Sequence, residues 1–270
     1  MPSESSYNAA MKSITSAHNE QLKHLSKLLT SARSRREHGQ TVLEGIHLLK
    51  SYLQAGLMPL QVYLPQAQLQ NAELQTALNA LPDDKITLIG DGALAKITSL
   101  SDADDVMTLI TIPRSPNLPR NGDCVVLDRV QDPGNVGTVI RSAAAAGITQ
   151  LICSKDCADV WSPKVLRAGM GAHFLLEVHT RTDLPTWFAA YPHPIRATAL
   201  SEQHNFSLYD LDLSAPSAWV FGNEGCGVSE EILAAVSHTV KIPMPGQTES
   251  LNVAMAATVC LFEQMRQRLA

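Results

Sequence analysis

Short apolar runs alternate with polar and glycine-rich stretches through the second half of the chain. Six runs predict strands: 124–128 ("CVVLD"), 149–153 ("TQLIC"), 174–179 ("FLLEVH"), 195–200 ("IRATAL"), 218–222 ("AWVFG") and 239–244 ("TVKIPM"). Helical patterns fall between them, over 135–147, from Ser162, over 184–191, over 229–237 and over 250–268. Such alternation predicts an α/β domain with a parallel sheet that helices cover on both faces.

The first half predicts a smaller α/β domain. Leucines 22, 25, 28 and 29 recur with Ala32 at helical spacing. A strand and helix follow over 41–56, then strands near 61–64, 86–90 and 106–113, with a helix over 72–81. The stretch from Ile112 to Asp123 has three prolines and no periodicity, which is typical of a linker. We therefore expect a flexible tail (1–18), a first domain (19–113), a linker (114–122) and a second domain (123–270).

Composition limits the class of protein. The 270 residues are 45% hydrophobic and 17% charged, which is typical of a globular protein. No apolar run approaches a membrane span and no secretory signal is evident. The five cysteines form no Cys-x-x-Cys pair, which favours reduced thiols in the cytoplasm and no metal site. A net charge of −5 argues against a general nucleic-acid or DNA binder.

Three predicted strands end in polar loops, and ligands of open α/β sheets bind at such ends. In "LDRVQDPGNVGTVIRSA" (127–143), Asn135 could simply cap a helix, but a cap does not explain Arg141 among small apolar residues. "VFGNEGCGVSEE" (220–231) brings three glycines around Glu224. "IPMPGQTESLNVA" (242–254) has more polar groups than one cap needs, although Ser250 could be that cap. A dinucleotide site is disfavoured because Gly134-x-x-Gly137 does not match G-x-G-x-x-G.

Together the three loops resemble the SpoU-type (TrmH-like) RNA ribose 2′-O-methyltransferases of the SPOUT superfamily. The first half, with "SRREHGQTVLEGIHLLK", resembles the L30e-like substrate-binding domain that many members carry. The resemblance implies a C-terminal trefoil knot, S-adenosyl-L-methionine as cofactor and a homodimer formed through the second domain. It also implies RNA as substrate, and the L30e-like domain favours ribosomal over transfer RNA. A transfer-RNA enzyme and a non-catalytic RNA-binding protein remain as alternatives.

Motif positions carry the family's functional residues onto this chain. The resemblance implies five catalytic residues, namely Asn135, Arg141, Glu224, Ser250 and Asn252. It places cofactor contacts, largely through backbone groups, at Leu200, Gly222, Ile242 and Leu251. An arginine base is implausible because its pKa lies above about 12. We therefore expect Arg141 to clamp the ribose hydroxyl and a neighbouring phosphate, which can itself take the proton.

RNA must meet a locally basic surface because the whole chain is acidic. The resemblance and the charge pattern place this surface on residues 23–36, and no comparable cluster follows residue 120. The simpler interpretation is that these basic side chains only face solvent and bind no RNA. The expected RNA-binding residues are Lys23, Lys27, Arg33, Arg35 and Arg36.

Overall fold

The computed structural model describes residues 12–16, 19–90, 92–98, 105–114, 117–200 and 205–269. The chain divides into two compact units. The first comprises Met1–Ile112 with Trp161–Arg167, and the second comprises Pro113–Val160 with Ala168–Ala270. The short return segment Trp161–Arg167 lies within the predicted second domain (123–270) but groups with the first unit. Within that unit its Trp161 carbonyl accepts a hydrogen bond from Thr41 Oγ1 at 2.8 Å.

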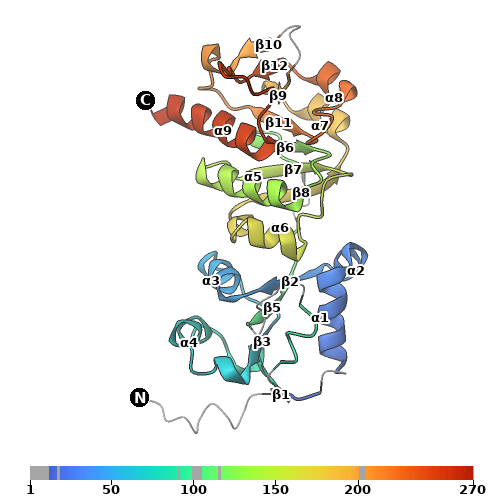
Figure 1. The fold of residues 1–270 in the computed structure, drawn as a ribbon, viewed down its shortest axis with the longest axis vertical. Coiled ribbons are helices and arrows are strands. Elements are labelled where there is room, and N and C mark those ends of the chain that lie inside the picture. Colours follow the sequence, from blue (N-terminus) through green and yellow to red (C-terminus); the bar gives the residue numbers. More distant parts are fainter. Residues whose placement is uncertain are drawn as a thin grey trace. The chain divides into compact units, whose positions relative to one another are not determined.

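The first unit is a five-stranded sheet with helices on both faces (Figure 1). Its strand order is β1-β4-β3-β5-β2, with β2 and β3 antiparallel to β5. Leucines of α1 pack with Tyr63 on one face, whereas Val62 and Leu64 pack with α4 on the other. The elements are β1 (Lys12–Ile14), α1 (Glu20–Thr30), α2 (Ala32–His38), β2 (Gln40–Glu44), α3 (Ile46–Gln54), β3 (Gln61–Pro65), α4 (Ala72–Leu78), β4 (Ile86–Ile89) and β5 (Met107–Thr111).

Two features of the first unit differ from expectation. The helical pattern through Ala32 is broken at Ser31, whose extended backbone ends α1 and whose hydroxyl accepts a hydrogen bond from Ser34 N at 3.2 Å. A Ser that caps a second helix in this way turns one predicted helix into two. Strand β1 lies within the stretch expected to be a flexible tail, where it pairs with β4. Residues 1–11, 17 and 18 of that stretch lie outside the described residues.

The second unit confirms the predicted parallel sheet (Figure 1). Its seven strands follow the order β10-β12-β9-β11-β6-β7-β8, and every pairing is parallel. The strands are β6 (Cys124–Asp128), β7 (Gln150–Ser154), β8 (Glu177–Thr182), β9 (Ile195–Thr198), β10 (Asn205–Ser207), β11 (Ala218–Gly222) and β12 (His238–Lys241). The helices are α5 (Pro133–Ala145), α7 (Leu184–Ala190), α8 (Glu230–Ala235) and α9 (Val253–Leu269). Helix α6 (Pro163–Ala168) belongs to the first unit up to Arg167.

Strand β8 begins later than the apolar run over 174–179 predicts. The apolar run from Phe174 begins in a 3₁₀ turn, Ala172–Leu175, and the strand starts only at Glu177. Short apolar runs do not distinguish a turn from a strand by periodicity alone. Strand β10 was not predicted. The trefoil knot implied by the family resemblance stays a prediction.

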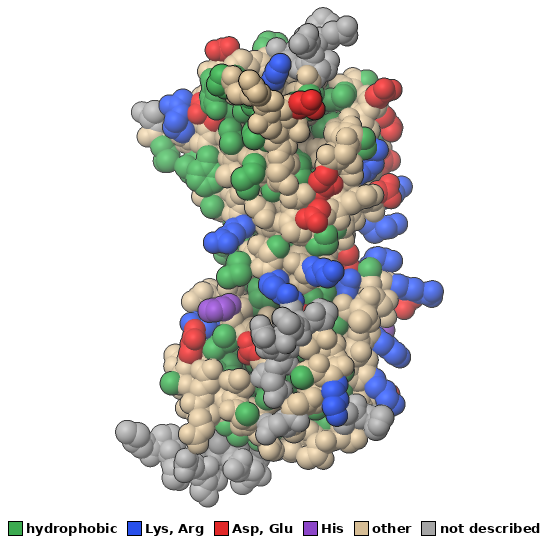
Figure 2. All heavy atoms as spheres, viewed as in Figure 1, with side chains coloured by type: hydrophobic (Ala, Val, Ile, Leu, Met, Phe, Trp, Pro, Cys, Tyr) green, Lys and Arg blue, Asp and Glu red, His purple; other side chains and the backbone are tan. Residues whose placement is uncertain are grey.

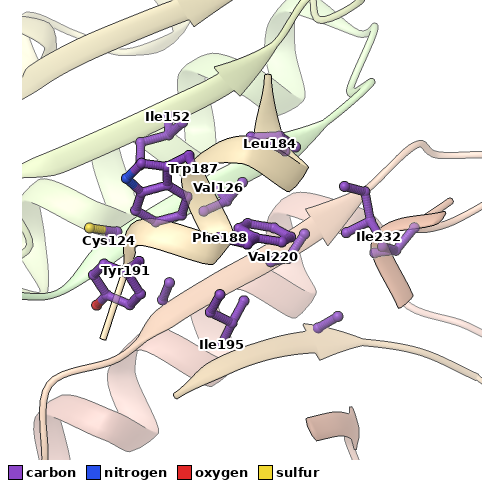
Figure 3. Close-up of a cluster of buried hydrophobic side chains, with 13 residues drawn as sticks. Cys124, Val126, Ile152, Leu184, Trp187, Phe188, Tyr191, Ile195, Val220 and Ile232 are labelled. Atoms are coloured by element: carbon purple, nitrogen blue, oxygen red, sulfur yellow. The ribbon is translucent and has the colours of Figure 1, made fainter. Parts of the chain in front are cut away.

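Alternation along the strands builds a core on each face of the second sheet. Side chains such as Val126 and Val220 meet Trp187 and Phe188 of α7 (Figure 3). Their neighbours face the other way: Trp219 donates from Nε1 to Gln264 Oε1 of α9 at 2.7 Å. Both faces are therefore filled, and the carboxyl edge of the sheet is left for the loops. Among the described helices, none has the length and apolar character of a membrane-spanning segment.

Candidate active site

The three polar loops leave from neighbouring strands. Strand β11 lies between β9 and β6, with Gly222 opposite Asp128, and β12 follows β9. Because all these strands are parallel, the loops after β6, β11 and β12 emerge at one edge of the sheet. The sequence motifs are thus brought together although 76 residues separate the first from the second.

The loop after β6 starts α5 with a cap other than the one expected. Asp132 Oδ1 accepts a hydrogen bond from Asn135 N at 2.8 Å, and Pro133 occupies the first turn. This is the usual arrangement of an acidic N-cap followed by proline. The simpler reading of Asn135 as the cap is therefore wrong. Its side chain is free to bind other groups of the site.

Glu224 joins the second loop to the first. Its carboxylate accepts hydrogen bonds from Gln131 N (3.2 Å), Asp132 N (3.0 Å) and Asn135 Nδ2 (3.0 Å). Partial burial by itself would raise the pKa of Glu224, but these hydrogen bonds outweigh it and hold the pKa below its usual value. The group is therefore a carboxylate at neutral pH, and it acts as an acceptor.

Asn252 extends this network to the third loop. Its Nδ2 donates to Asn135 Oδ1 at 2.9 Å, while its Oδ1 accepts from Ala254 N at 2.9 Å. Asn252, not Ser250, therefore caps α9, which begins at Val253. Ser250 lies exposed two residues earlier. A continuous chain of hydrogen bonds thus connects Glu224, Asn135 and Asn252.

Asn223 is a positioning residue that is not among the residues predicted from the sequence. It donates from Nδ2 to the carbonyl of Arg129 at 2.9 Å, and its Oδ1 accepts from Gly225 N at 2.9 Å. Its backbone exchanges two hydrogen bonds with Gly227 at 3.0 and 2.9 Å. These contacts close the loop on itself and set the direction of the adjacent Glu224. An Asn at the start of a glycine-rich turn was the available signal.

Gly222 is required by close packing. A Cβ at this position would lie 2.1 Å from Val228 N and 2.2 Å from the carbonyl carbon of Gly227. Both contacts are with backbone, which cannot rotate away. Gly225 differs, since its Cβ would meet only Asn223 Oδ1, at 3.5 Å.

Arg141 lies on the exposed side of α5. It follows Asn135 by six residues, about 9 Å along the helix axis. Within the described part of the chain, no ion pair or hydrogen bond holds its guanidinium. Ser142 beside it bonds Thr258 of α9 at 2.7 Å, which fixes the helix without engaging the arginine. The cation is therefore available to a ligand.

The expected cofactor residues lie at the same edge. Leu200 follows β9, Gly222 ends β11 and Ile242 follows β12, and these three strands are neighbours. Leu200 is 58% exposed and Leu251 is 39% exposed. Apolar side chains left open beside a polar network suit a ligand with both a flat ring and charged groups. Among the described residues, no group of three His, Cys, Asp or Glu side chains could hold a metal ion.

Comparison with known proteins identifies the family. Residues 123–262 match the SpoU rRNA Methylase family, and residues 19–108 match the MRM3-like substrate binding domain. The chain belongs to the SpoU rRNA methylase family. The first match contains all three loops, and the second covers most of the first unit.

Relatives of the SpoU family align over nearly the whole chain. An uncharacterised tRNA/rRNA methyltransferase of Synechocystis is 36% identical, covering 96% of this chain and 95% of that protein. The 23S rRNA (guanosine(2553)-2′-O)-methyltransferase RlmP of Bacillus subtilis is 29% identical, covering 93% and 98%. The crystal structure of AviRb from Streptomyces viridochromogenes, in complex with AdoMet, has a TM-score of 0.83 at 26% identity, covering 93% and 99%.

The first unit of this SpoU protein retains most of the expected basic surface. Lys23 and Lys27 on α1 and Arg33 and Arg36 on α2 are exposed. Figure 2 shows Lys and Arg side chains along the edge of the unit where these helices lie. Arg35 does not belong to it: it is 4% exposed and donates to the carbonyls of Leu28 and Leu29. It ties α2 to the end of α1, so its assignment to RNA binding is wrong.

The packing at Gly222 yields a test of the second loop. Gly222→Ala is expected to lower the free energy of unfolding by about 3 kcal/mol, because backbone atoms must move to admit the methyl group. Gly225→Ala is the matched control and should change it by less than about 1 kcal/mol. Urea unfolding followed by tryptophan fluorescence measures both variants. Equal stabilities would show that the loop is not constrained at Gly222.

Proposed function

We propose that this protein transfers the methyl group of S-adenosyl-L-methionine to a ribose 2′-hydroxyl of ribosomal RNA. The observation that carries the proposal is the hydrogen-bonded chain Glu224–Asn135–Asn252, which joins the three family loops. Arg141 is available on the same helix as Asn135. Relatives that bear the names of rRNA 2′-O-methyltransferases, and a structural relative with bound AdoMet, support it.

The chemistry of the carboxyl edge supports a role in binding the cofactor. Leu200, Ile242 and Leu251 offer apolar surface for an adenine ring, and the tight turn at Gly222 offers backbone groups for its polar edge. When bound, S-adenosylmethionine supplies a methyl group on a sulfonium that departs as a neutral thioether. The chain's own part is therefore to orient the hydroxyl and accommodate its proton.

Arg141 performs the electrostatic part of that task. Arginine side chains stay charged in proteins, so Arg141 acts as a fixed cation and not as a base. As a planar donor it can grip the 2′-oxygen and an adjacent phosphate together, and the phosphate oxygen can accept the proton. Asn135, fixed by Glu224 and Asn252, and the exposed Ser250 position the ribose. Alignment of this kind contributes roughly 7–11 kcal/mol in favourable cases.

Ribosomal RNA is the favoured substrate because residues 123–262 match the SpoU rRNA Methylase family and the relative RlmP is named for 23S rRNA. Transfer RNA is the alternative, which the name of the Synechocystis relative leaves open. Mapping 2′-O-methyl sites in a strain that lacks the gene decides between them. A site lost from ribosomal RNA supports the proposal, and a site lost only from transfer RNA refutes it. The cytoplasmic location stays a prediction.

Arg141→Ala should abolish methyl transfer and leave the affinity for S-adenosylmethionine within a few-fold, because the side chain lies on α5 and the cofactor loops lie elsewhere. Arg141→Lys should also fail, since an ammonium cannot reproduce a planar two-point grip. Methyl incorporation and titration calorimetry measure the two effects. Parallel loss of cofactor binding would assign Arg141 a structural role. Wild-type protein that binds RNA and cofactor without transfer would support the non-catalytic alternative.

We propose that the second unit forms a homodimer through α9. Met255, Phe262 and Leu269 are spaced seven residues apart and are 49%, 38% and 79% exposed. This spacing places them on one side of the helix. Figure 2 shows hydrophobic side chains gathered where α5 and α9 lie. An exposed apolar stripe of this kind favours burial against a second copy.

A double variant tests the dimer. Met255→Glu with Phe262→Glu should give a monomer by light scattering, because two carboxylates would be buried without partners. Phe206→Glu, which changes a 49% exposed aromatic residue on the edge strand β10, should leave the dimer intact. A fully active wild-type monomer would contradict the proposal.

We propose that the exposed cations of α1 and α2 bind RNA phosphates. Lys27→Ala, Arg33→Ala and Arg36→Ala together should weaken RNA binding and flatten its salt dependence by roughly 0.7–0.9 per lost phosphate contact. Lys50→Ala, on α3 of the opposite face, is the control. Filter binding over a salt series measures both. An unchanged slope in the triple variant would show that this surface is merely solvated.

A further inference from the structure

Three basic residues line the carboxyl edge of adjacent strands in the second unit. Arg129 directly follows β6, Lys155 directly follows β7, and Arg181 is the penultimate residue of β8. These strands are neighbours, with Leu127 opposite Cys153 and Ser154 opposite Thr182. Adjacent strands lie about 4.8 Å apart, so the row spans roughly 10 Å.

The backbone at both ends of this row is unusual. Arg129 and Arg181 have φ values of 57° and 59°, in the left-handed region that glycine adopts without cost. Met170 is the one other non-glycine residue in that region within the described part of the chain. A strained conformation retained with a long charged side chain points to a role for that side chain. Lys155 and Arg181 are exposed, and the side chain of Arg129 is 34% exposed.

The row is connected directly to the candidate active site. Arg129 N donates to Ser154 Oγ at 2.9 Å, and the Arg129 carbonyl accepts from Asn223 Nδ2 at 2.9 Å. Ser154 precedes Lys155, and Asn223 precedes Glu224. The same backbone contacts therefore hold the start of the row beside the loop that positions Asn135.

Nearby carboxylates do not remove the row's capacity to bind an anion. Asp128 is 3% exposed, lies 3.4 Å from Arg129 Nε and accepts from Ser229 N at 2.9 Å. Asp183 accepts from Thr186 N at the start of α7. Both carboxylates thus have local donors, which leaves Asp156 as the exposed acid beside Lys155. The Nε atom of Arg129 is buried without a hydrogen bond, although 34% of the side chain as a whole is exposed.

We propose that Arg129, Lys155 and Arg181 form a phosphate-binding row on the second unit that holds the substrate RNA backbone beside the target ribose. The inference rests on the proposed function and adds an RNA surface beyond that of α1 and α2. It corrects the expectation that no basic cluster follows residue 120. The three residues are far apart in sequence, and only the parallel strand order places them side by side.

The left-handed backbone gives this proposal a sharp test. Arg129→Gly with Arg181→Gly removes two charges and also relieves both backbone conformations. The double variant should bind an unmodified ribosomal RNA transcript about tenfold more weakly, with a salt slope flatter by roughly 0.7–0.9 per lost contact. Its affinity for S-adenosylmethionine should equal that of wild type, and its thermal midpoint should be equal or higher. Filter binding, calorimetry and thermal unfolding measure these quantities.

Two further variants complete the experiment. Arg120→Gly removes an exposed arginine before the amino end of β6, at the opposite edge of the sheet, and should leave RNA binding unchanged. Lys155 has an ordinary backbone conformation, so Lys155→Glu changes only the charge. Because it replaces a positive charge with a negative one, it should weaken RNA binding more than removal of one positive charge would.

The proposed row would be refuted if the double variant bound RNA with the affinity and salt slope of the wild type. It would also be refuted if the double variant had a lower thermal midpoint and lost cofactor binding and RNA binding together. Wild-type protein that fails to bind cofactor or to methylate RNA would instead refute the proposed function.

Discussion

The carboxylate of Glu224 is the contact on which the candidate site depends. It is a single acceptor group that holds two backbone N–H groups of one loop and the side chain of Asn135, while its own residue belongs to another loop. Hydrogen bonds to a charged acceptor are stronger than neutral ones, so one residue can keep two irregular segments in register. Asn135 is then committed on one side and offers its oxygen to Asn252. Without the carboxylate, the first two loops would keep the contact between Asn223 and the Arg129 carbonyl but would lose the three hydrogen bonds that hold the start of α5.

This contact is possible only because of the strand order. Strands β6 and β11 are adjacent with Gly222 opposite Asp128, so the loops that follow them begin side by side. Gly222 permits the second loop to fold back against its own backbone, which brings Asn223 and Glu224 over the first loop. The strand order therefore brings the two loops close together. Gly222 directs the second loop toward the first, and the Glu224 carboxylate holds the two loops at hydrogen-bonding distance.

Much of this fold could be predicted from sequence because its strands are buried on both faces. Runs such as "CVVLD" and "AWVFG" match β6 and β11 residue for residue, since a parallel strand covered on both sides must be apolar throughout. Helix starts were less predictable, because several polar residues compete for the cap. Asp132 displaced Asn135 at α5, and Asn252 displaced Ser250 at α9. Asn135, which does not cap α5, and Asn252, which caps α9, both belong to the candidate site.

The location of exposed positive charge was the feature that the sequence predicted least well. Arg35 lies in the most basic stretch and yet is buried. The helix break at Ser31 turns α2 so that the guanidinium of Arg35 reaches the carbonyls at the end of α1. Arg129, Lys155 and Arg181 lie in unremarkable stretches and yet share one sheet edge. An acidic chain can therefore present cations where a polyanion must approach, since local arrangement and not net charge sets the field near the surface. The two arginines in left-handed backbone indicate that this arrangement is maintained at a conformational cost, which glycine at either position would have avoided.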